Sequence, residues 1–404
     1  MAWLFEDAKP SSQELKKMSH NVELSTVTLM PANPTGSDEA DFCSVSETLD
    51  WLTKSGIRTT LLGVRPMYQQ KSPNDDLTIL RKRVHYFSLP GKAWRPISGA
   101  FLFARIVGQL REFQRTERID VLHAHGLLPC GHAAMLLSKE LSIPYVVSVY
   151  GLQDLDTVES AGRAEKWRRR IALRVCAESG RVVCGSEQIR EQVLERTNRG
   201  CRTSVVYDGV NAELFSPGPE PSGDVPTVLS GGNFGAREGH DLLIRATAAL
   251  VKDFPSISLE IFGDGPGRTR LEALVKQQGL AGVVHFLGRQ PRSEVAAKMK
   301  RCTLFALPSQ SERVGCLHLE AMSSAKAVIG CRGQGIAEVI DHGTNGFLVG
   351  PENERELALA LRLLLHEPER RRNLAAASRD TILDRFTVQQ QARNLGRIYR
   401  EVAG

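Results

Sequence analysis

The sequence predicts an α/β protein with two doubly wound, Rossmann-like domains, and three observations support this fold class. The chain has 404 residues, which exceeds the size of one ordinary hydrophobic core. Each half alternates short runs rich in β-branched residues with helical stretches, as in parallel sheets covered by helices. Between the halves, residues 216–226 contain four prolines and two glycines, which indicates a linker. The expected domains are therefore residues 1–216 and 217–387.

The first domain is expected to begin its sheet with Val27-Thr28-Leu29-Met30, which precedes a loop rich in proline and glycine. A helix is predicted from Ser44 to Lys54, because Gly56 ends the helical pattern. Further parallel strands are predicted where short apolar runs recur, at 59–64, 121–125, 145–149 and 182–184.

The second domain repeats this order, and each predicted strand leads into a glycine or proline turn that precedes a helix. The predicted strands are 227–229, 257–262, 283–287 and 304–307. In an open parallel sheet, ligands bind at the carboxyl ends of the strands, which is where these turns lie. The turns of the second domain are therefore the expected place for a ligand.

The composition is typical of a water-soluble globular enzyme, with 42% hydrophobic and 24% charged residues. No window approaches the roughly 20 apolar residues of a membrane span. The first residues are acidic near their start and lack a long apolar run, so they do not indicate a signal peptide. The eight cysteines are scattered without a CxxC pair, which predicts reduced thiols and a cytoplasmic location.

The net charge of +6 is modest, but basic residues concentrate in the first domain. Residues 81–118 contain nine lysines and arginines against two glutamates, together with the apolar run 97–104. A second basic cluster occupies 166–170. Such patches fit peripheral contact with anionic lipid at the inner face of the cell membrane, or an acidic substrate, and they equally fit a solvated helix face. No motif for nucleic-acid binding accompanies them.

The most informative segment is 307–342, in which Glu312 and Glu320 stand eight residues apart. The pattern predicts a loop from Pro308 to Cys316 and a helix from Leu317 to Ala325. A diphosphate can rest on the N–H groups at such a helix start, where the helix dipole favours negative charge. A carboxylate about one turn further on can accept both hydroxyl hydrogens of a ribose, so the geometry suits a sugar nucleotide. The alternative is a strand-to-helix crossover with solvated glutamates.

Segment 307–342 resembles the donor-site signature of the family-four retaining glycosyltransferases. The similarity to that family covers nearly all of residues 25–403 and is densest over 205–350. Further segments match the family in order and spacing, at 206–211, 263–266, 286–288 and 345–349. Each of these short matches is weak evidence alone, and together they make the resemblance specific.

The resemblance implies the GT-B fold, in which two Rossmann-like domains face each other across a cleft. The donor, a UDP- or GDP-sugar, would bind mostly to the second domain, and a carbohydrate, lipid-linked or small-molecule acceptor to the first. A C-terminal helix at 388–404 would pack back on the first domain. The implied reaction transfers the sugar to a hydroxyl with retention, needs no metal and no other cofactor, and serves surface polysaccharide or glycolipid synthesis. The nearest Asp-x-Asp triplet, Asp154-Leu155-Asp156, is interpreted as an acidic pair at a helix start.

The resemblance also implies roles for individual residues. Glu320 would bind the donor ribose, and Glu312 would bind hydroxyls of the transferred sugar. Backbone N–H groups at the helix start would stabilise the departing diphosphate. The other donor-site positions are glycine turns, the helix start and two residues beside the base, namely Gly36, Gly232, Gly263, Gly315, Cys316, Leu317, Arg289 and Gln290.

The chain departs from the family where positive charge for the phosphates is usually supplied. Within 232–239, Asn233 replaces the usual arginine and Glu238 the usual lysine, while Arg237 lies one position early. Arg237 is expected to reach the phosphates, because a guanidinium on a long side chain suits phosphate oxygens. Glu238 would repel a diphosphate and is expected to face away from it.

In the first domain, Tyr150 stands where many relatives have a histidine near the transferred sugar. Its hydroxyl is the expected polar group there, and the alternative is a buried aromatic at a strand end. His123 and His125 would share one strand face because of their spacing. A metal pair would need a third ligand that the sequence does not show. His125, at the carboxyl end of its strand, is therefore the better functional candidate.

Two other functions remain open from the sequence. The altered residues at Asn233 and Glu238 are compatible with a non-catalytic homologue that binds a sugar nucleotide. A sugar-nucleotide epimerase of the same fold is the second alternative, and the complete motif order speaks against it. Release of free nucleoside diphosphate would distinguish a transferase from both.

Overall fold

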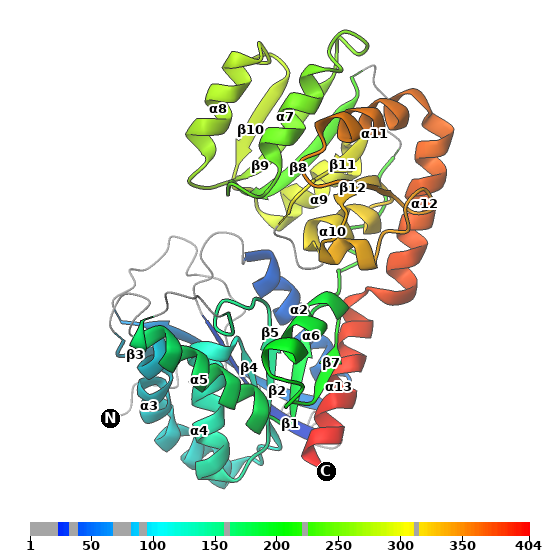
Figure 1. Cartoon of the computed structure of the whole chain (residues 1–404). Coiled ribbons are helices and arrows are strands. Elements are labelled where there is room, and N and C mark those ends of the chain that lie inside the picture. Colours follow the sequence, from blue (N-terminus) through cyan, green and yellow to red (C-terminus); the bar gives the residue numbers. More distant parts are fainter. Residues whose placement is uncertain are drawn as a thin grey trace.

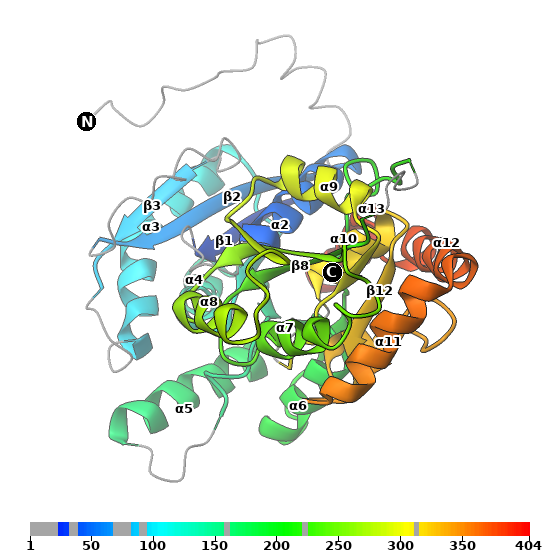
Figure 2. The same cartoon turned by 90° about the horizontal axis from the view of Figure 1, so that it is seen from above.

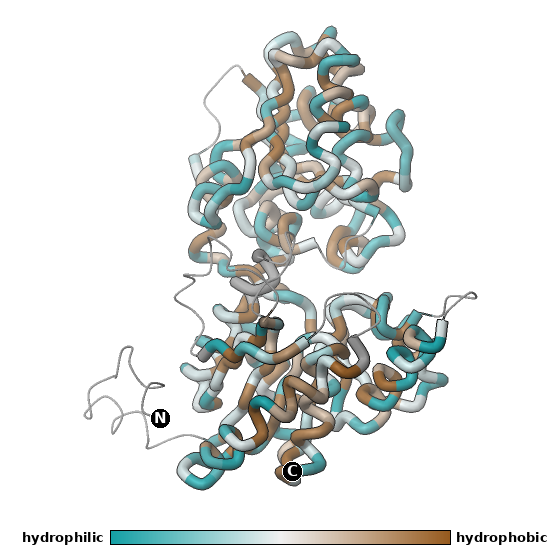
Figure 3. The backbone as a smooth tube through the Cα atoms, turned by 90° about the vertical axis from the view of Figure 1, so that its left-hand side faces the viewer, coloured by the Kyte–Doolittle hydropathy of each residue, from teal (hydrophilic) through white to brown (hydrophobic). Residues whose placement is uncertain are grey.

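The computed structural model describes residues 23–31, 39–67, 82–88, 95–156, 162–219, 225–310 and 315–404. Over these residues the chain forms two parallel sheets with helices on both faces of each (Figure 1). The predicted fold class is thus confirmed. In Figure 3 the hydrophobic segments run through the interior of both domains.

Within the described ranges the first sheet has seven strands in the order β3-β2-β1-β4-β5-β6-β7. Their bounds are β1 (Leu24–Pro31), β2 (Ile57–Pro66), β3 (Lys82–Tyr86), β4 (Val121–His125), β5 (Tyr145–Val149), β6 (Arg181–Cys184) and β7 (Thr203–Val205). The order reverses between β1 and β4, which is where doubly wound sheets bind ligands.

Helices cover both faces of this sheet because neighbouring residues of each strand point to opposite sides. Leu122 and Val147 pack in one core with α3 (Arg95–Thr116), α4 (His132–Leu141) and α5 (Arg163–Glu178). Val121 and Val146 pack in the opposite core with α2 (Glu39–Lys54) and α13 (Val388–Ala403). The short helices η2 (Leu127–Gly131) and α6 (Glu187–Arg196) complete the domain.

In the described part of the second half, the sheet has six strands in the order β10-β9-β8-β11-β12-β13. They are β8 (Thr227–Asn233), β9 (Ser258–Asp264), β10 (Val284–Gly288), β11 (Leu304–Ala306), β12 (Ala327–Cys331) and β13 (Phe347–Val349). The helices are α7 (His240–Ala248), α8 (Arg268–Gln277), α9 (Arg292–Arg301), α10 (Cys316–Ser323), η3 (Gly335–Glu338), α11 (Glu354–His366) and α12 (Pro368–Arg385). Here the strand order reverses between β8 and β11, so the expected ligand edge lies beside α7 and α10.

Helix α13 returns the chain to the first domain. It begins with a capping box in which Thr387 and Gln390 satisfy each other's backbone N–H groups. Its residue Gln391 accepts a hydrogen bond of 2.7 Å from the Thr48 hydroxyl on α2. In Figure 1 this helix lies along the first domain, and Figure 2, seen from above, shows α7 and α9 of the second domain on opposite sides of β8.

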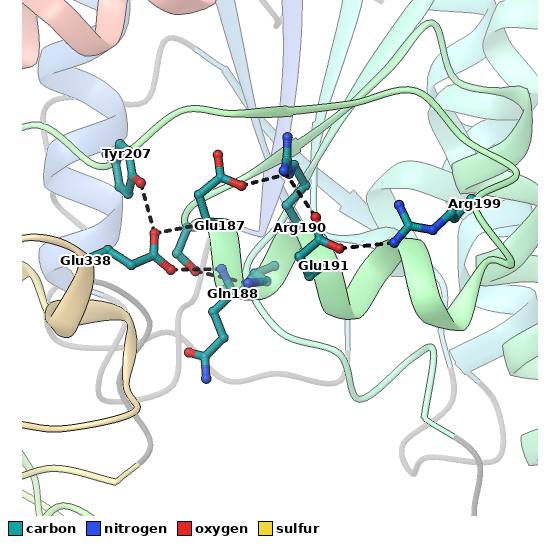
Figure 4. Close-up of polar contacts among 9 residues, drawn as sticks. Glu187, Gln188, Arg190, Glu191, Arg199, Tyr207 and Glu338 are labelled. Atoms are coloured by element: carbon teal, nitrogen blue, oxygen red, sulfur yellow. Dashed lines mark hydrogen bonds and ion pairs between the residues drawn. The ribbon is translucent and has the colours of Figure 1, made fainter.

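A carboxylate of the second domain also caps a helix of the first (Figure 4). Glu338 accepts hydrogen bonds of 2.8 Å from the backbone N–H groups of both Glu187 and Gln188, at the start of α6. The Tyr207 hydroxyl donates to the same carboxylate at 2.9 Å. A carboxylate at the positive end of a helix is favourable, so this contact, the Glu338 cap, ties the domains together.

Two sequence interpretations need correction. Asp154 lies in a turn and Asp156 just after it, neither at a helix start, and they pair with Arg168 at 3.8 Å and Arg196 at 2.9 Å. Arg168, in the second basic cluster, is buried and belongs to an ion pair, so it is not part of a solvated face. The helix predicted to reach Ala325 ends at Ser323, because the Ala325 backbone is left-handed with a φ of 52°.

No helix in the described ranges is both long enough and apolar enough to cross a membrane. All seven cysteines whose side chains are described, Cys130, Cys176, Cys184, Cys201, Cys302, Cys316 and Cys331, are free thiols.

Candidate active site

The glycine turns after β8 and β9 form the centre of the candidate donor site. Gly232 and Gly263 have φ angles of 121° and 113°, which side-chain-bearing residues rarely adopt. A Cβ on Gly263 would lie 1.9 Å from the carbonyl oxygen of Gly232, so the two turns touch through their backbones. A Cβ on Gly232 would lie 3.7 Å from Leu317, which places the β8 turn beside the start of α10.

The start of α10 offers backbone N–H groups at this edge. Gly315 precedes the helix with a φ of 75°, and its carbonyl accepts from His318 N at 2.8 Å and Leu319 N at 3.1 Å. The N–H groups of Gly315, Cys316 and Leu317 lie ahead of these first helical bonds. They are at the positive end of the helix dipole, as a diphosphate site requires.

Glu320 lies in the second turn of α10, and its side chain is only 4% exposed. Its Oε1 accepts a hydrogen bond of 2.7 Å from Nη1 of Arg292, the first residue of α9. The Arg292 guanidinium in turn lies over the Phe215 ring, 5.0 Å from its centroid. The ring and the ion pair hold this carboxylate in place.

Arg237 and Glu238 lie in the loop between β8 and α7. Arg237 is exposed, and its Nη2 donates to the Gln310 carbonyl at 3.1 Å, while Gln310 N donates to the Arg237 carbonyl at 2.8 Å. Glu238 accepts from the Ser309 hydroxyl at 3.1 Å. These three hydrogen bonds connect the loop that carries Arg237 to residues 309 and 310, which precede residue 312 in the chain.

The remaining donor-site candidates lie around the same edge. Asn233 ends β8, and its Oδ1 is buried without a hydrogen-bond partner in the described ranges. Arg289 is exposed after β10, and the amide of Gln290 donates to the Leu287 carbonyl at 2.6 Å. Glu312 and Gly36 lie outside the described residues. We call the set around the two sheet turns and α10 the donor edge, comprising Gly232, Asn233, Gly263, Gly315, Cys316, Leu317 and Glu320.

Polar side chains also gather at the carboxyl ends of β4 and β5 in the first domain. The two nitrogens of His123 lie 2.6 Å from the Tyr399 hydroxyl on α13 and 2.8 Å from the Ser148 hydroxyl. Nδ1 of His125 is hydrogen-bonded to the Tyr150 hydroxyl. We call these five side chains the polar floor. Two first-domain candidates, His125 and Tyr150, belong to it.

Burial keeps the histidines of the polar floor neutral. It lowers the pKa of His125 to about 3. Burial, and then the neighbouring His125, lower the pKa of His123 well below its usual value. Nε2 of His125 is buried and has no hydrogen-bond partner within the described ranges. His125 lines a pocket together with Tyr150, Asp208 and Gln391.

A histidine metal pair is not supported over the described parts of the chain. Both nitrogens of His123 already lie in hydrogen bonds, and no group of three potential ligand side chains occurs there.

Sequence reasoning missed Arg292, Ser148 and Tyr399, which touch the candidate residues. For Arg292 the sequence shows a basic residue shortly after the β10 turn, and this pattern does not indicate which residue it contacts. Tyr399 had none, since 276 positions separate it from His123.

Comparisons with known proteins agree with this arrangement of the two domains. The family model of glycosyl transferases group 1 matches residues 212–381, and the model of glycosyltransferase family 4 matches residues 44–214. An uncharacterized glycosyltransferase of Methanocaldococcus jannaschii is 28% identical over 288 residues, covering 71% of this chain and 77% of its own length. The alpha-D-kanosaminyltransferase of Streptomyces kanamyceticus is 25% identical over 367 residues, covering 84% of this chain and 94% of its own.

Solved structures show the same fold. Sucrose-phosphate synthase from Thermosynechococcus elongatus superposes with a TM-score of 0.73 at 20% identity, covering 94% of this chain and 98% of the other. HepE of Anabaena, in complex with UDP and glucose, superposes with a TM-score of 0.74 at 19% identity, covering 93% and 99%. The two family models together span most of the chain. This protein belongs to the group 1, family 4 glycosyltransferases and has their GT-B fold.

Proposed function

We propose that the protein transfers a sugar from a UDP- or GDP-sugar to a hydroxyl acceptor, with retention at the anomeric carbon. The observation that carries this proposal is the donor edge. There, two glycine loops with positive φ meet the start of α10, and the buried carboxylate of Glu320 lies about one helical turn further along that helix. The UDP and glucose bound in the HepE structure support a donor of this class.

The donor edge would act on the two ends of the nucleotide. The carboxylate of Glu320 would accept hydrogen bonds from the ribose, and the N–H groups of Gly315, Cys316 and Leu317 would face the diphosphate. Arg237 would add a positive charge, since its guanidinium donates a hydrogen bond to the Gln310 carbonyl and has further N–H groups. Interactions that strengthen as charge moves onto the leaving diphosphate accelerate the transfer.

The acceptor would bind over the polar floor. With a pKa of about 3, His125 is neutral at physiological pH and can offer Nε2 only as a neutral hydrogen-bonding group. It would therefore orient an acceptor hydroxyl and would not act as the base that removes its proton. We propose a front-face displacement: the acceptor oxygen bonds to the anomeric carbon as the diphosphate leaves, and the leaving phosphate oxygen takes the acceptor proton. Such a step needs no metal and no further cofactor.

A lipid-linked acceptor is favoured by an apolar patch with basic neighbours. Met67, Phe87 and Phe101 are exposed, and the two phenylalanine rings pack edge to face at 5.2 Å. Arg83 on β3 and Arg105 on α3 are exposed; Phe87 directly follows β3, and Phe101 lies on α3. Arg111, Arg115 and Arg118 contribute less charge because they pair with Glu140, Glu112 and Asp120. Sedimentation with anionic vesicles at low salt tests this contact, and Phe87→Ser with Phe101→Ser should abolish it.

The test of the main proposal is turnover by the purified protein with a panel of UDP- and GDP-sugars in the presence of a chelator. Release of nucleoside diphosphate and an α-linked product from an α-linked donor, seen by NMR, are the expected results. Conversion of the donor to an epimer without nucleotide release would identify an epimerase. Tight nucleotide binding without hydrolysis or transfer would identify a non-catalytic homologue. An inverted product would overturn retention alone.

A further inference from the structure

Arg292 is placed where helix stability does not explain it. It is the first residue of α9, at the positive end of the helix dipole, where a cation is unfavourable. Glu294 in the same turn is the residue type that such a position favours. A guanidinium at this position therefore needs another partner to account for it.

That partner is Glu320, 28 positions further along the chain. A carboxylate with only 4% of its side chain exposed is costly to ionise unless a cation or donors accompany it. Nη1 of Arg292 reaches Oε1 at 2.7 Å, and the fully buried Phe215 ring lies under the guanidinium. The arginine is thus held on one side by an aromatic face and on the other by the carboxylate.

We propose that Arg292 is a positioning residue that fixes Glu320 for the ribose and thereby makes the site selective for ribonucleotides over 2′-deoxyribonucleotides. This inference rests on the proposed donor site. The bond to Oε1 sets the carboxylate plane, so that its other acceptor positions face a ligand seated on the donor edge. Removing Arg292 leaves the carboxylate present but takes away the 2.7 Å hydrogen bond and the positive charge that orient it. The site should then lose its discrimination at the 2′ position before it loses the nucleotide.

The experiment compares the affinities of UDP and 2′-deoxy-UDP, and of GDP and 2′-deoxy-GDP, by calorimetric titration. Wild-type protein should prefer the ribonucleotide about tenfold or more, the usual value of a hydrogen bond to a charged group. Arg292→Ala should reduce that ratio to about threefold or less while binding of the deoxynucleotide changes little. Arg292→Lys should restore part of the ratio. Arg301→Ala is the matched control, because it removes an exposed arginine from the other end of α9 and should keep the wild-type ratio.

Each outcome separates this inference from the proposed function. An unchanged ratio in Arg292→Ala, or equal gains in affinity for both nucleotides, would show that Arg292 does not position Glu320. Wild-type protein that binds neither UDP nor GDP would overturn the donor site and this assignment together. Should Arg292→Ala fail to fold, Arg292→Gln keeps a neutral donor at the same place and must show an intermediate ratio.

Discussion

The donor edge and the polar floor both lie at the carboxyl ends of parallel strands, but they are built from different chemistry. The donor edge is mostly backbone: glycines with positive φ, a helix start and one buried carboxylate. The polar floor is made of side chains, with neutral histidines whose partners come from other strands and from α13. A site formed by backbone groups suits a part of the ligand that stays the same, such as a diphosphate. A site formed by side chains can change by substitution to suit different acceptors.

The largest expected effect is a loss of stability when the donor edge is disrupted. Gly263→Ala should destabilise the second domain by about 4 kcal/mol, because overpacking and backbone strain each contribute about 1–3 kcal/mol. Its Cβ would meet the Gly232 carbonyl oxygen at 1.9 Å. Gly232→Ala is the matched variant, since its φ is equally positive but its nearest atom is 3.7 Å away. Urea unfolding curves measure both, and equal losses would contradict the contact between the turns.

The second prediction concerns pH and the polar floor. The unfolded chain protonates a histidine near pH 6.5, whereas native His125 resists protonation until about pH 3. The unfolded state therefore binds more protons between these values, and stability must fall as the pH drops through this window. The expected loss is about 2 kcal/mol from His125 at pH 5. Burial also lowers the pKa of His240, to about 4, which adds to the effect from the second domain.

Thermal or urea unfolding between pH 4 and 7 tests this pH dependence. His125→Gln should reduce the slope of stability against pH, because it removes one of the titrating groups. A wild-type stability that is constant across the window would contradict the buried, neutral state of the polar floor.

The third prediction separates binding from turnover. Glu320→Ala should weaken both donor and free nucleotide by about 1–3 kcal/mol, because ribose contacts are lost. Tyr150→Phe, in the polar floor, should leave nucleotide affinity unchanged. Glu312→Ala should depress turnover while nucleoside diphosphate binding stays nearly intact. Calorimetric titration of the variants measures this, and equal losses of nucleotide affinity in Glu320→Ala and Glu312→Ala would refute the division of roles.

The smallest effect concerns the phosphate charge. Arg237→Ala should reduce turnover about tenfold, or roughly 1.4 kcal/mol, because its charge would matter most as the diphosphate leaves. Asn233→Arg should be neutral or improving, since it restores a cation at the β8 turn. Initial rates at saturating donor measure both. An unchanged rate in Arg237→Ala would mean that the side chain serves only its bond to Gln310.

The sequence predicted the fold well because the strands carry local signals. β4 and β5 have the predicted bounds, since strands buried on both faces appear as continuous apolar runs. The glycine turns and the helix start of the donor edge could also be predicted from the sequence, because neighbouring residues encode them. The pairs Arg292–Glu320 and His123–Tyr399 were not, since nothing periodic links residues 28 or 276 positions apart. Such contacts depend on which helix packs on which strand.

Because of the Glu338 cap, hydrogen exchange at the start of α6 would depend on the opening of the cleft between the two domains. Within α6, the amide of Ile189 is satisfied by Ser186 of its own domain, whereas the amides of Glu187 and Gln188 depend on a carboxylate from the other domain. Hydrogen exchange at these two amides would therefore follow each separation of the domains, even while α6 stays folded. Ile189, protected locally, supplies the reference rate. The time the cleft spends open is thus measurable at backbone positions away from the donor edge, without an attached probe or a bound ligand.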